Sequence, residues 1–336
     1  MATQTEAEDM LPASFGRLMR EQHPLADARR GDTLDEPRHY AKWASLDQGG
    51  WLELADVEAE PGTHYPLALG EMMGRSLLNL PLAFSAYVLH PLCQQVPELL
   101  GAGTVLPWQR HPGVGRVEQA EPEDDARFID FHGRRACYYR LAPAGERDGS
   151  WQIQRYDGTD VDVVAGMDVC GALGCLPAGS AAAQAGFSLP WASMQPLLRR
   201  YLAVELAQTL GAAAAALDMA VSYATERRQF GKPIGQYQAI KHALANAWVA
   251  LDNGRYAVRA LLGEGAAPDV AGIATRLVVA AATQATKLAI QVHGGIGFAW
   301  EHDAHLFLKR VYHKRLEVQR LARLLDTYQH PVRIAA

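Results

Sequence analysis

The sequence has 336 residues, of which 49% are hydrophobic and 21% are charged. This is the ordinary balance of a globular protein with more than one domain and a large core. The formal net charge of −5 gives no general attraction to nucleic acid or to an anionic membrane, so we expect neither as a partner. The first residues, MATQTEAEDM, are acidic and lack the apolar run of a secretory signal, which predicts a cytoplasmic protein.

Residues 1–103 have the pattern of a helical domain. Apolar residues recur in part of this region at near-helical intervals: Leu67, Met72, Leu77 and Leu80. Pro81 and Pro91 follow in the same stretch. Because proline lacks a backbone N–H and clashes with the preceding turn of a helix, we expect both prolines to end or bend helices.

Residues 104–190 change in character and are richer in glycine, proline and charge. Short apolar runs at 126–133, 136–143 and 151–158 read ARFIDFHG, ACYYRLAP and WQIQRYDG. Runs of this length, separated by turn residues, are typical of β-strands. We therefore expect a reduced β domain in the middle of the chain.

Residues 191–336 carry the longest helical patterns. Four stretches combine strong helix formers with helical periodicity and are joined by short connections: 196–229, 237–251, 269–293 and 305–328. The alanines at 212–216 suit a close approach between helices, and we expect the basic residues of the last stretch on its solvent face. Long helices with short loops predict a four-helix bundle. The expected fold class is mainly α with a small β middle domain.

The stretch YATERRQFGKPIGQYQAIKHALA, at 223–245, gathers cations at the expected end of a helix. In one interpretation, Arg227, Arg228 and Lys232 only complement the negative end of the helix dipole. In the other, the guanidinium of Arg227 binds a pyrophosphate through paired hydrogen bonds, and Phe230 covers an adjacent flat ring. The stretch alone leaves both interpretations open.

The stretch QVHGGIGFAWEHDAHLFLKR, at 291–310, is compatible with a metal site, a phosphate loop or a plain turn between helices. The ligands of the metal site would be His302 and His305, with His293 and His313 nearby. We do not expect a metal, because the pair His302 and His305 lacks the i,i+4 spacing of a helical metal pair and has no apparent third ligand, and the cysteines also lack the spacing of a zinc site. Paired glycines instead let a ligand approach the backbone beside a helix N-terminus. The pattern is not a dinucleotide-binding fingerprint, since GxGxxG is absent and no strand precedes it.

Together, the stretches at 223–245 and 291–310 closely resemble the C-terminal domain of the acyl-CoA dehydrogenase family. The resemblance is strong over 195–325, and it continues weakly through GGWLELADVEAEPGTHYPLALGEMMGRSLLNLPLAF, which is similar to the family's N-terminal helical domain. It implies an acyl-CoA dehydrogenase-like fold, an FAD cofactor, and contacts to the ADP half of an FAD that a neighbouring subunit shares. By position, the contacting residues would be Arg227, Phe230, Gln238, Gln291, Gly294 and Gly295.

The resemblance also implies a reaction. A carboxylate removes the α-proton of an acyl-CoA thioester, the β-carbon gives hydride to the flavin, and the electrons pass to an electron-transfer flavoprotein. The base must lie within hydrogen-bond reach of the proton. Gapless counting from the two motifs places the family's two base positions on Val318 and Tyr201, which are not carboxylates. The nearest acids, Glu317 and Glu205, are therefore the candidate bases.

The middle region also departs from the family. It lacks the TEP-x-AGSD-like turn that holds the flavin in relatives, and VEQAEPEDDARF, at 117–128, is the nearest stretch. A chain with the ADP-side motifs but neither base nor ring site resembles the shortened subunit of heteromeric acyl-CoA dehydrogenases of the steroid side-chain type, which acts with a full-length partner. The alternatives are a self-sufficient dehydrogenase that uses Glu205 or Glu317, acting alone or with copies of itself, and a helical scaffold that has lost flavin.

Overall fold

The structure, a computed structural model, describes a set of residue ranges: 4–29, 35–57, 65–96, 113–117, 127–143, 150–164, 166–176, 184–263, 266–267 and 269–329. The chain divides into two compact units. Unit 1 comprises Met1–Arg29, His64–Leu78 and Leu202–Ala322, and unit 2 comprises Arg30–Thr63, Asn79–Tyr201 and Arg323–Ala336. Each unit draws on segments far apart in the sequence, so the three consecutive domains expected from composition stay a prediction.

The N-terminal region is helical, as the sequence predicts. Unit 1 contains α1 (Gln4–Gln22), α2 (Leu25–Ala28) and α5 (Tyr65–Arg75). Unit 2 contains α3 (Glu36–Gln48), the 3-10 turn η1 (Trp51–Glu53), α4 (Leu54–Val57), α6 (Leu82–Phe84), the π-helical turn η2 (Ser85–Leu89) and α7 (His90–Gln95). Pro81 is the N-cap of α6, which confirms that it marks a helix end. Pro91 lies just after the π-helical turn, inside a helical run that continues from 82 to 95, so it does not end a helix there.

The middle region of unit 2 forms two sheets from the described strands. These are β1 (Gly113–Val117), β2 (Arg127–Phe131), β3 (Cys137–Pro143), β4 (Ser150–Asp157), β5 (Asp162–Val164), β6 (Ala172–Leu176) and β7 (Gln184–Pro190). One sheet has the order β1-β3-β4-β7, with β1 parallel to β3 and the other pairs antiparallel. The other has the order β2-β6-β5 and is antiparallel. The predicted strands correspond to β2, β3 and β4 and are confirmed.

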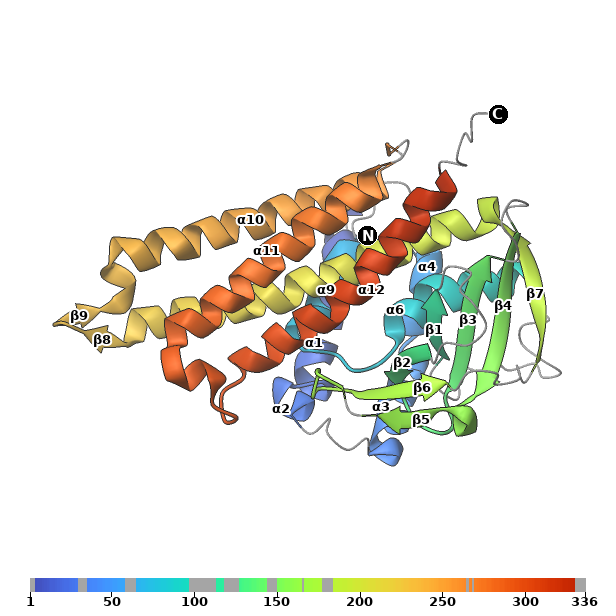
Figure 1. Cartoon of the computed structure of the whole chain (residues 1–336), viewed down its shortest axis with the longest axis horizontal. Helices are drawn as coiled ribbons and strands as arrows, with labels where there is room; N and C mark the ends of the chain where they lie inside the picture. The colour runs from blue at the N-terminus through green and yellow to red at the C-terminus, as the bar shows by residue number, and fades with distance from the viewer. Residues whose placement is uncertain are drawn as a thin grey trace. The chain divides into compact units, whose positions relative to one another are not determined.

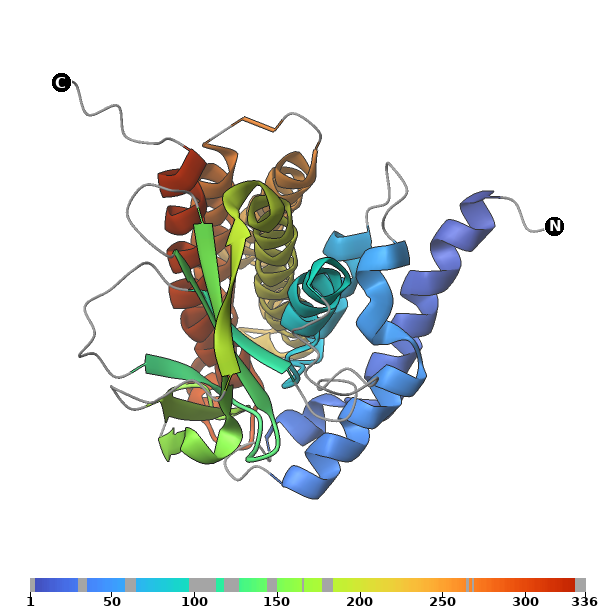
Figure 2. The same cartoon turned by 90° about the vertical axis from the view of Figure 1, so that its right-hand side faces the viewer.

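The C-terminal region is built on four long helices. They are α9 (Trp191–Glu226), α10 (Gln238–Leu262), α11 (Val270–His293) and α12 (Ala304–Gln329). The hairpin β8 (Arg228–Gln229) and β9 (Lys232–Pro233) and the 3-10 turn η5 (Ile234–Gln236) join α9 to α10, and the 3-10 turn η6 (Gly294–Phe298) follows α11. Figure 1 shows the four helices lengthwise, and Figure 2 shows them foreshortened, running side by side. The predicted bundle and the mainly α fold class are confirmed.

Close packing between α9 and α5 explains the small residues of both helices. A Cβ on Gly211 would lie 2.1 Å from the carbonyl oxygen of Glu71, and a Cβ on Gly74 would lie 2.0 Å from that of Gln208. Neither glycine position has space for a side chain, because protein interiors are closely packed. The neighbouring alanines of α9, residues 212–216, are buried, except that Ala215 is half-buried. The close helix approach expected from the alanine run is confirmed.

Two of the described helices are long and apolar enough to cross a bilayer by length and composition. In the apolar window of the first, Trp191–Glu226, 78% of the residues are buried, and in that of the second, Val270–Phe298, 56% are buried. A helix in the core of a helical bundle can be as apolar as a helix that crosses a membrane, so burial in the bundle explains the apolar composition of both helices.

Candidate functional site

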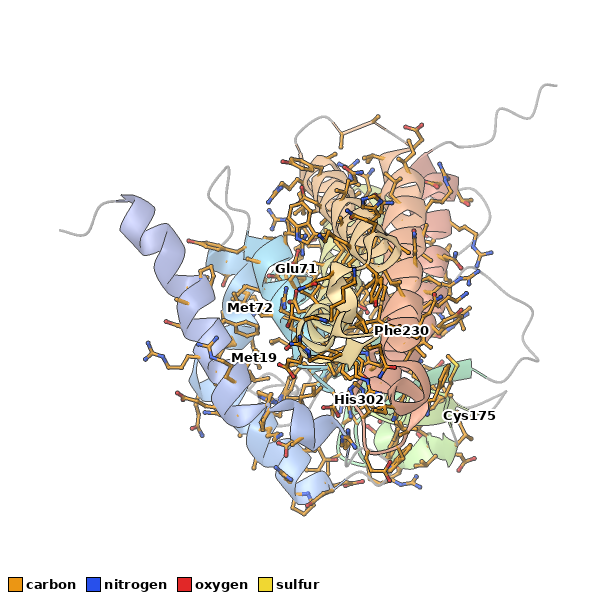
Figure 3. The ribbon with its side chains drawn as sticks, turned by 90° about the vertical axis from the view of Figure 1, so that its left-hand side faces the viewer. Met19, Glu71, Met72, Cys175, Phe230 and His302 are labelled. Atoms are coloured by element: carbon orange, nitrogen blue, oxygen red, sulfur yellow. The ribbon has the colours of Figure 1, made fainter. Side chains whose placement is uncertain are left out.

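The two motifs that the sequence singles out lie at the same end of the bundle. The β8–β9 hairpin follows α9 and η6 follows α11, and both are at the left-hand end of the bundle in Figure 1. Here the ring of Tyr223, near the end of α9, lies 4.7 Å from the ring of His293, the last residue of α11, measured between centroids. Figure 3 looks onto this end, with Phe230 and His302 labelled. The chain thus brings the predicted cofactor motifs together.

The tip of the β8–β9 hairpin is strained and exposed. Phe230 has φ of +50° and Gly231 has φ of +84°. A two-residue hairpin turn with two positive φ values fits the twist of the strands, but the left-handed region disfavours a bulky residue such as phenylalanine. The ring of Phe230 is 94% exposed, so packing inside this chain does not offset the strain. Strain of this kind is typical of functional loops.

Arg227 has a fixed backbone and an exposed side chain. Its N–H donates to the carbonyl oxygen of Tyr223 at 2.8 Å, which ends α9. The following strand is fixed by Tyr237, whose hydroxyl donates to the carbonyl oxygen of Gln229 at 3.1 Å. No carboxylate among the described residues pairs with the guanidinium of Arg227. Gln238, the first residue of α10, is exposed at the same end.

The three glycines of HGGIGF have different roles. Gly294 ends α11 with φ of +65°, and its N–H donates to the carbonyl oxygens of Gln291 and Ile290. A Cβ on Gly297 would lie 3.0 Å from the carbonyl oxygen of Ile290, so this glycine lets η6 pack on α11. Gly295 is different, because its φ is not positive and nothing lies within 4 Å of its Cβ position. The fold does not need a glycine there, but a ligand that approaches the backbone does. The side chain of Gln291 is exposed beside this space.

The loop after η6 is held by aromatic stacking and an arginine. The ring of His302 lies 4.3 Å from that of His293, so these histidines contact each other. Arg29, just after α2, donates from Nε to Asp303 Oδ1 at 2.5 Å and from Nη1 to the carbonyl oxygen of Trp300 at 2.7 Å. Burial, and next the neighbouring ring of His293, lower the pKa of His302. Among the described residues, no group of three or more potential ligands could hold a metal ion.

Both candidate bases contact the same lysine. Glu205 on α9 is 2% exposed, and its Oε2 lies 2.7 Å from Nζ of Lys314 on α12. The amide of Gln208 donates to the other oxygen of Glu205 at 3.1 Å. Oε2 of Glu317 lies 3.3 Å from the same Nζ. The ammonium of Lys314 therefore contacts both carboxylates. Val318, where gapless counting places a base, is buried in the core.

The expectation that the basic residues of α12 lie on its solvent face is wrong for Arg310 and Lys314. Arg310 is 6% exposed and donates from Nη1 to the carbonyl oxygen of Leu78 at 3.1 Å, and Lys314 is 9% exposed. Arg310 and Lys314 are one helical turn apart and therefore lie on the same face of α12. The buried Val311 and Val318 lie beside them, so this pattern could have predicted that both side chains face the core. Buried charges are retained in a fold when they have partners, as both have here.

The segment of the missing flavin-cradling turn is largely outside the described residues. Val117 ends β1 and Arg127 begins β2, and 118–126, between them, is not among the described residues. The absence of a ring-holding turn at 117–128 therefore stays a prediction.

The exposed end of the bundle has the chemistry of a nucleotide site. It presents a cation without a carboxylate partner, an open glycine backbone and an exposed aromatic ring, contributed by Arg227, Gly295 and Phe230. Guanidinium groups bind phosphate through paired hydrogen bonds, and a bare glycine lets a phosphate or ribose approach the main chain. These residues fit the ADP half of FAD.

Comparison with known proteins gives a local match in sequence. Residues 198–320 match the family described as acyl-CoA dehydrogenase, C-terminal domain. The acyl-CoA dehydrogenase IpdE2 of Mycobacterium tuberculosis is 41% identical over 109 residues, which cover 32% of this chain and 33% of that protein. The chain thus spans about a third of the length of the curated relatives that it matches first.

Comparison with solved structures gives a match over the whole chain. A chain of the ChsE4-ChsE5 complex from Mycobacterium tuberculosis has a TM-score of 0.76 at 19% identity, with 100% of both chains covered. A chain of the Tcur3481-Tcur3483 steroid ACAD has a TM-score of 0.73 at 17% identity, with 96% of this chain and 98% of that chain covered. At this identity the likeness shows the fold alone. The predicted acyl-CoA dehydrogenase-like fold is confirmed.

Proposed function

Because residues 198–320 match the C-terminal domain of acyl-CoA dehydrogenases, we propose that the chain is a subunit of an FAD-dependent acyl-CoA dehydrogenase. The complex oxidises an acyl-CoA thioester to the α,β-enoyl-CoA. Within it, this chain is the subunit that contacts the nucleotide of FAD without supplying the catalytic base. A full-length acyl-CoA dehydrogenase subunit is the partner, and an electron-transfer flavoprotein accepts the electrons.

The nucleotide contacts follow from the bundle end. Arg227 pairs with the pyrophosphate, and Phe230, held outward at the hairpin tip, packs against the adenosine side. Gly294 and Gly295 let the nucleotide approach the main chain, and Gln291 and Gln238 offer their exposed carboxamides. When bound, the flavin supplies the chemistry of hydride acceptance. The residues of this chain hold and orient its ADP half.

The proposal that this chain does not supply the catalytic base rests on one observation: both candidate carboxylates, Glu205 and Glu317, contact the ammonium of Lys314. A base that takes a carbon-bound proton needs an oxygen that can reach the substrate, and its pKa is raised by a dry site. Glu205 has one oxygen on Lys314 and the other on Gln208, and Glu317 also contacts Lys314. Oxygens that are held in these contacts are not positioned to take a proton from a substrate. Glu205 and Lys314 instead join α9 to α12.

Exposed apolar side chains support an assembly with another subunit. At the bundle end they are Phe230, Ile296, Phe298 and Trp300, and along α10 and α11 they are Trp248, Val249, Tyr256, Ile273 and Leu277. Each of them is more than a third exposed. Large exposed apolar patches mark protein interfaces. The fold neighbours include chains of the ChsE4-ChsE5 complex and of the Tcur3481-Tcur3483 steroid ACAD, and these support a heteromer that acts on the acyl-CoA of a steroid side chain or a fatty acid.

The flavin-to-polypeptide ratio tests this function. The chain is purified alone and, separately, together with the partner that co-purifies with it from the native host, and flavin absorbance is compared with peptide content. The chain alone should be almost colourless, and the complex should hold stoichiometric FAD and bleach when acyl-CoA is added. A yellow homo-oligomer that oxidises acyl-CoA would establish the self-sufficient alternative. A complex without flavin would establish the scaffold.

A further inference from the structure

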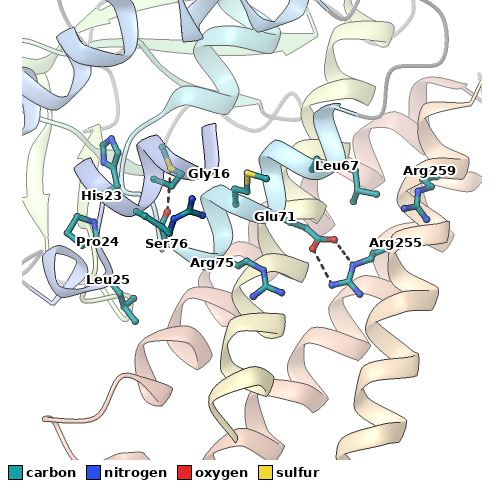
Figure 4. Close-up of a pocket in the computed structure, with 14 residues that line it drawn as sticks. Gly16, His23, Pro24, Leu25, Leu67, Glu71, Arg75, Ser76, Arg255 and Arg259 are labelled. Atoms are coloured by element: carbon teal, nitrogen blue, oxygen red, sulfur yellow. Dashed lines mark hydrogen bonds and ion pairs between the residues drawn. The ribbon is translucent and has the colours of Figure 1, made fainter. Parts of the chain in front are cut away.

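A cavity of about 870 Å³ lies within unit 1, away from both motifs. Its lining comes from α1, α2, α5 and α10 and the residues between α1 and α2, and it includes none of the residues assigned above to the nucleotide or to the Glu205–Lys314 pair. Figure 4 shows Pro24 and Leu25 on one side of it and Arg255 and Arg259 on the other. Pockets that hold small molecules commonly have volumes of roughly 300–1,000 Å³.

The inner wall of the cavity is apolar. Met19 is 3% exposed and Leu67 is 5% exposed, and the half-buried Leu25, Ala68 and Met72 continue the surface. A methionine-rich wall adapts to ligands of different shape, because the thioether side chain is flexible and polarisable. Such a wall is suited to bind the apolar part of a ligand, such as a hydrocarbon chain.

One ion pair in the wall is already satisfied. Glu71 on α5 accepts two hydrogen bonds from Arg255 on α10, from Nε at 2.6 Å and from the second nitrogen, Nη2, at 3.2 Å. Both side chains are mostly buried, at 16% and 17% exposed. This bidentate pair, drawn with dashed lines in Figure 4, joins the two helices and leaves no net charge for a ligand.

The rim of the cavity carries excess positive charge. Arg75 pairs with Asp218 at 2.7 Å, but no carboxylate among the described residues pairs with Arg20 or Arg259. Both of these arginines are exposed, and the guanidinium of Arg259 lies 5.3 Å from the ring centroid of Tyr256. Two uncompensated guanidinium groups above an apolar wall attract an anion that is attached to a hydrocarbon body.

We propose that this cavity binds an anionic amphiphile, with its apolar body against Met19, Leu67 and Met72 and its acidic head group on an arginine of the rim, Arg20 or Arg259. The head group is a carboxylate or a phosphate ester, the two anions that guanidinium groups pair with. Such a ligand is a fatty or steroidal acid, or a lipid phosphate. The proposal does not depend on the function proposed above, because it involves neither flavin nor the partner.

Isothermal titration calorimetry of the 336-residue chain tests the proposal with decanoate, decyl phosphate and 1-decanol. Decanoate or decyl phosphate should bind saturably with one ligand per chain, and the tighter of the two identifies the head group. 1-Decanol has the same body without the charge, so it should bind about tenfold more weakly or worse. Binding of the alcohol as tightly as the acids would overturn the proposal, as would a lack of saturable binding by either acid.

Variants locate the binding in this cavity. R20Q combined with R259Q should weaken binding of the preferred acid about tenfold and leave that of 1-decanol unchanged. A68F, which adds a ring to the cavity wall, should weaken binding of all three probes. R276Q removes an equally exposed arginine on α11 and serves as the matched control, with no change. Circular dichroism melting confirms that each variant is folded, and wild-type affinity in folded R20Q/R259Q would overturn the proposal.

Discussion

Lys314 and Glu205 form a buried ion pair between α12 and α9, with 2.7 Å between Nζ and Oε2. The same Nζ contacts Glu317 at 3.3 Å. The two acids that are nearest to the family's base positions are thus tied to one cation. Their arrangement is that of a structural network, in which removing one partner leaves a charge buried.

The first prediction concerns this network and the stability of the subunit. K314M should lower the free energy of unfolding by about 3–5 kcal/mol, because the buried Glu205 then loses the ammonium that pairs with it at 2.7 Å. K287M removes an exposed lysine of α11 and should cost less than about 0.5 kcal/mol. Urea denaturation of the two variants measures the difference. Equal stability of K314M and K287M would mean that the pair contributes nothing.

A second prediction concerns the strained hairpin tip. F230G should leave the melting temperature of the isolated chain unchanged or raise it, because glycine accepts φ of +50° without strain. The same variant should lower the flavin content of the complex, because the exposed ring is lost. Melting curves and flavin absorbance are measured on the same preparations. Full flavin content in F230G would remove Phe230 from the site.

A third prediction separates the two paired glycines. G295A should be as stable as the parent chain, because nothing lies within 4 Å of the new methyl group, but should bind less flavin. G294A should lose both stability and flavin, because φ of +65° is strained for alanine. Thermal melting and flavin content distinguish the two effects. If G295A keeps its flavin, the nucleotide does not approach the main chain there.

A fourth prediction concerns Arg227. R227K keeps the charge but loses the planar pair of donors, so flavin affinity should fall about tenfold or more. R228K, at the next position of the hairpin and equally exposed, is the matched control and should keep its flavin. Both affinities are measured by fluorescence titration of the apo complex with FAD. A loss of the same size in both variants would show a general charge effect instead of a specific contact.

A fifth prediction concerns pH. Burial is the first cause that lowers the pKa of His302 and of His305 below the ordinary value of 6.5. The unfolded chain therefore binds these protons more readily, and the stability gained from the neutral rings is complete above pH 6.5 and lost as the pH falls towards the folded-state values. The melting temperature should fall more between about pH 7.5 and pH 5.5 in the parent than in H302Q/H305Q. Parallel pH profiles would show that other groups are responsible.

Helix and strand periodicity predicted much of the fold. The four long helices after residue 191 are continuous in sequence, and β2, β3 and β4 are rich in aromatic or β-branched residues, so local pattern identifies them. Strands β1, β6 and β7 were not predicted because glycine interrupts their pattern, and β5 has only three residues. Gly174 in β6, for example, is needed for packing, since a Cβ there would lie 2.5 Å from the side chain of Val161.

The cofactor motifs could be found from sequence, and their geometry could not. Arg227 and the glycines at 294 and 295 belong to recognisable local patterns, but only the Tyr223–His293 contact shows that they meet. The inward turn of Lys314 depends on Glu205, more than 100 residues earlier in the chain. No local pattern reports such a partner, because the pairing is decided by how α9 packs on α12.

The flavin reduction rate of the complex tests the central claim most directly. The complex is assembled with this chain carrying both E205Q and E317Q, mixed with acyl-CoA in a stopped-flow instrument, and followed at the flavin absorbance band. The double variant should be less stable, because Lys314 then stays buried without these two carboxylates, so the rate is measured on the folded, flavin-loaded complex. There we predict the same reduction rate per flavin as in the parent complex, because the proton is removed by a carboxylate of the partner. A rate that falls by orders of magnitude in a folded, flavin-loaded complex would contradict the account and place the base in this chain.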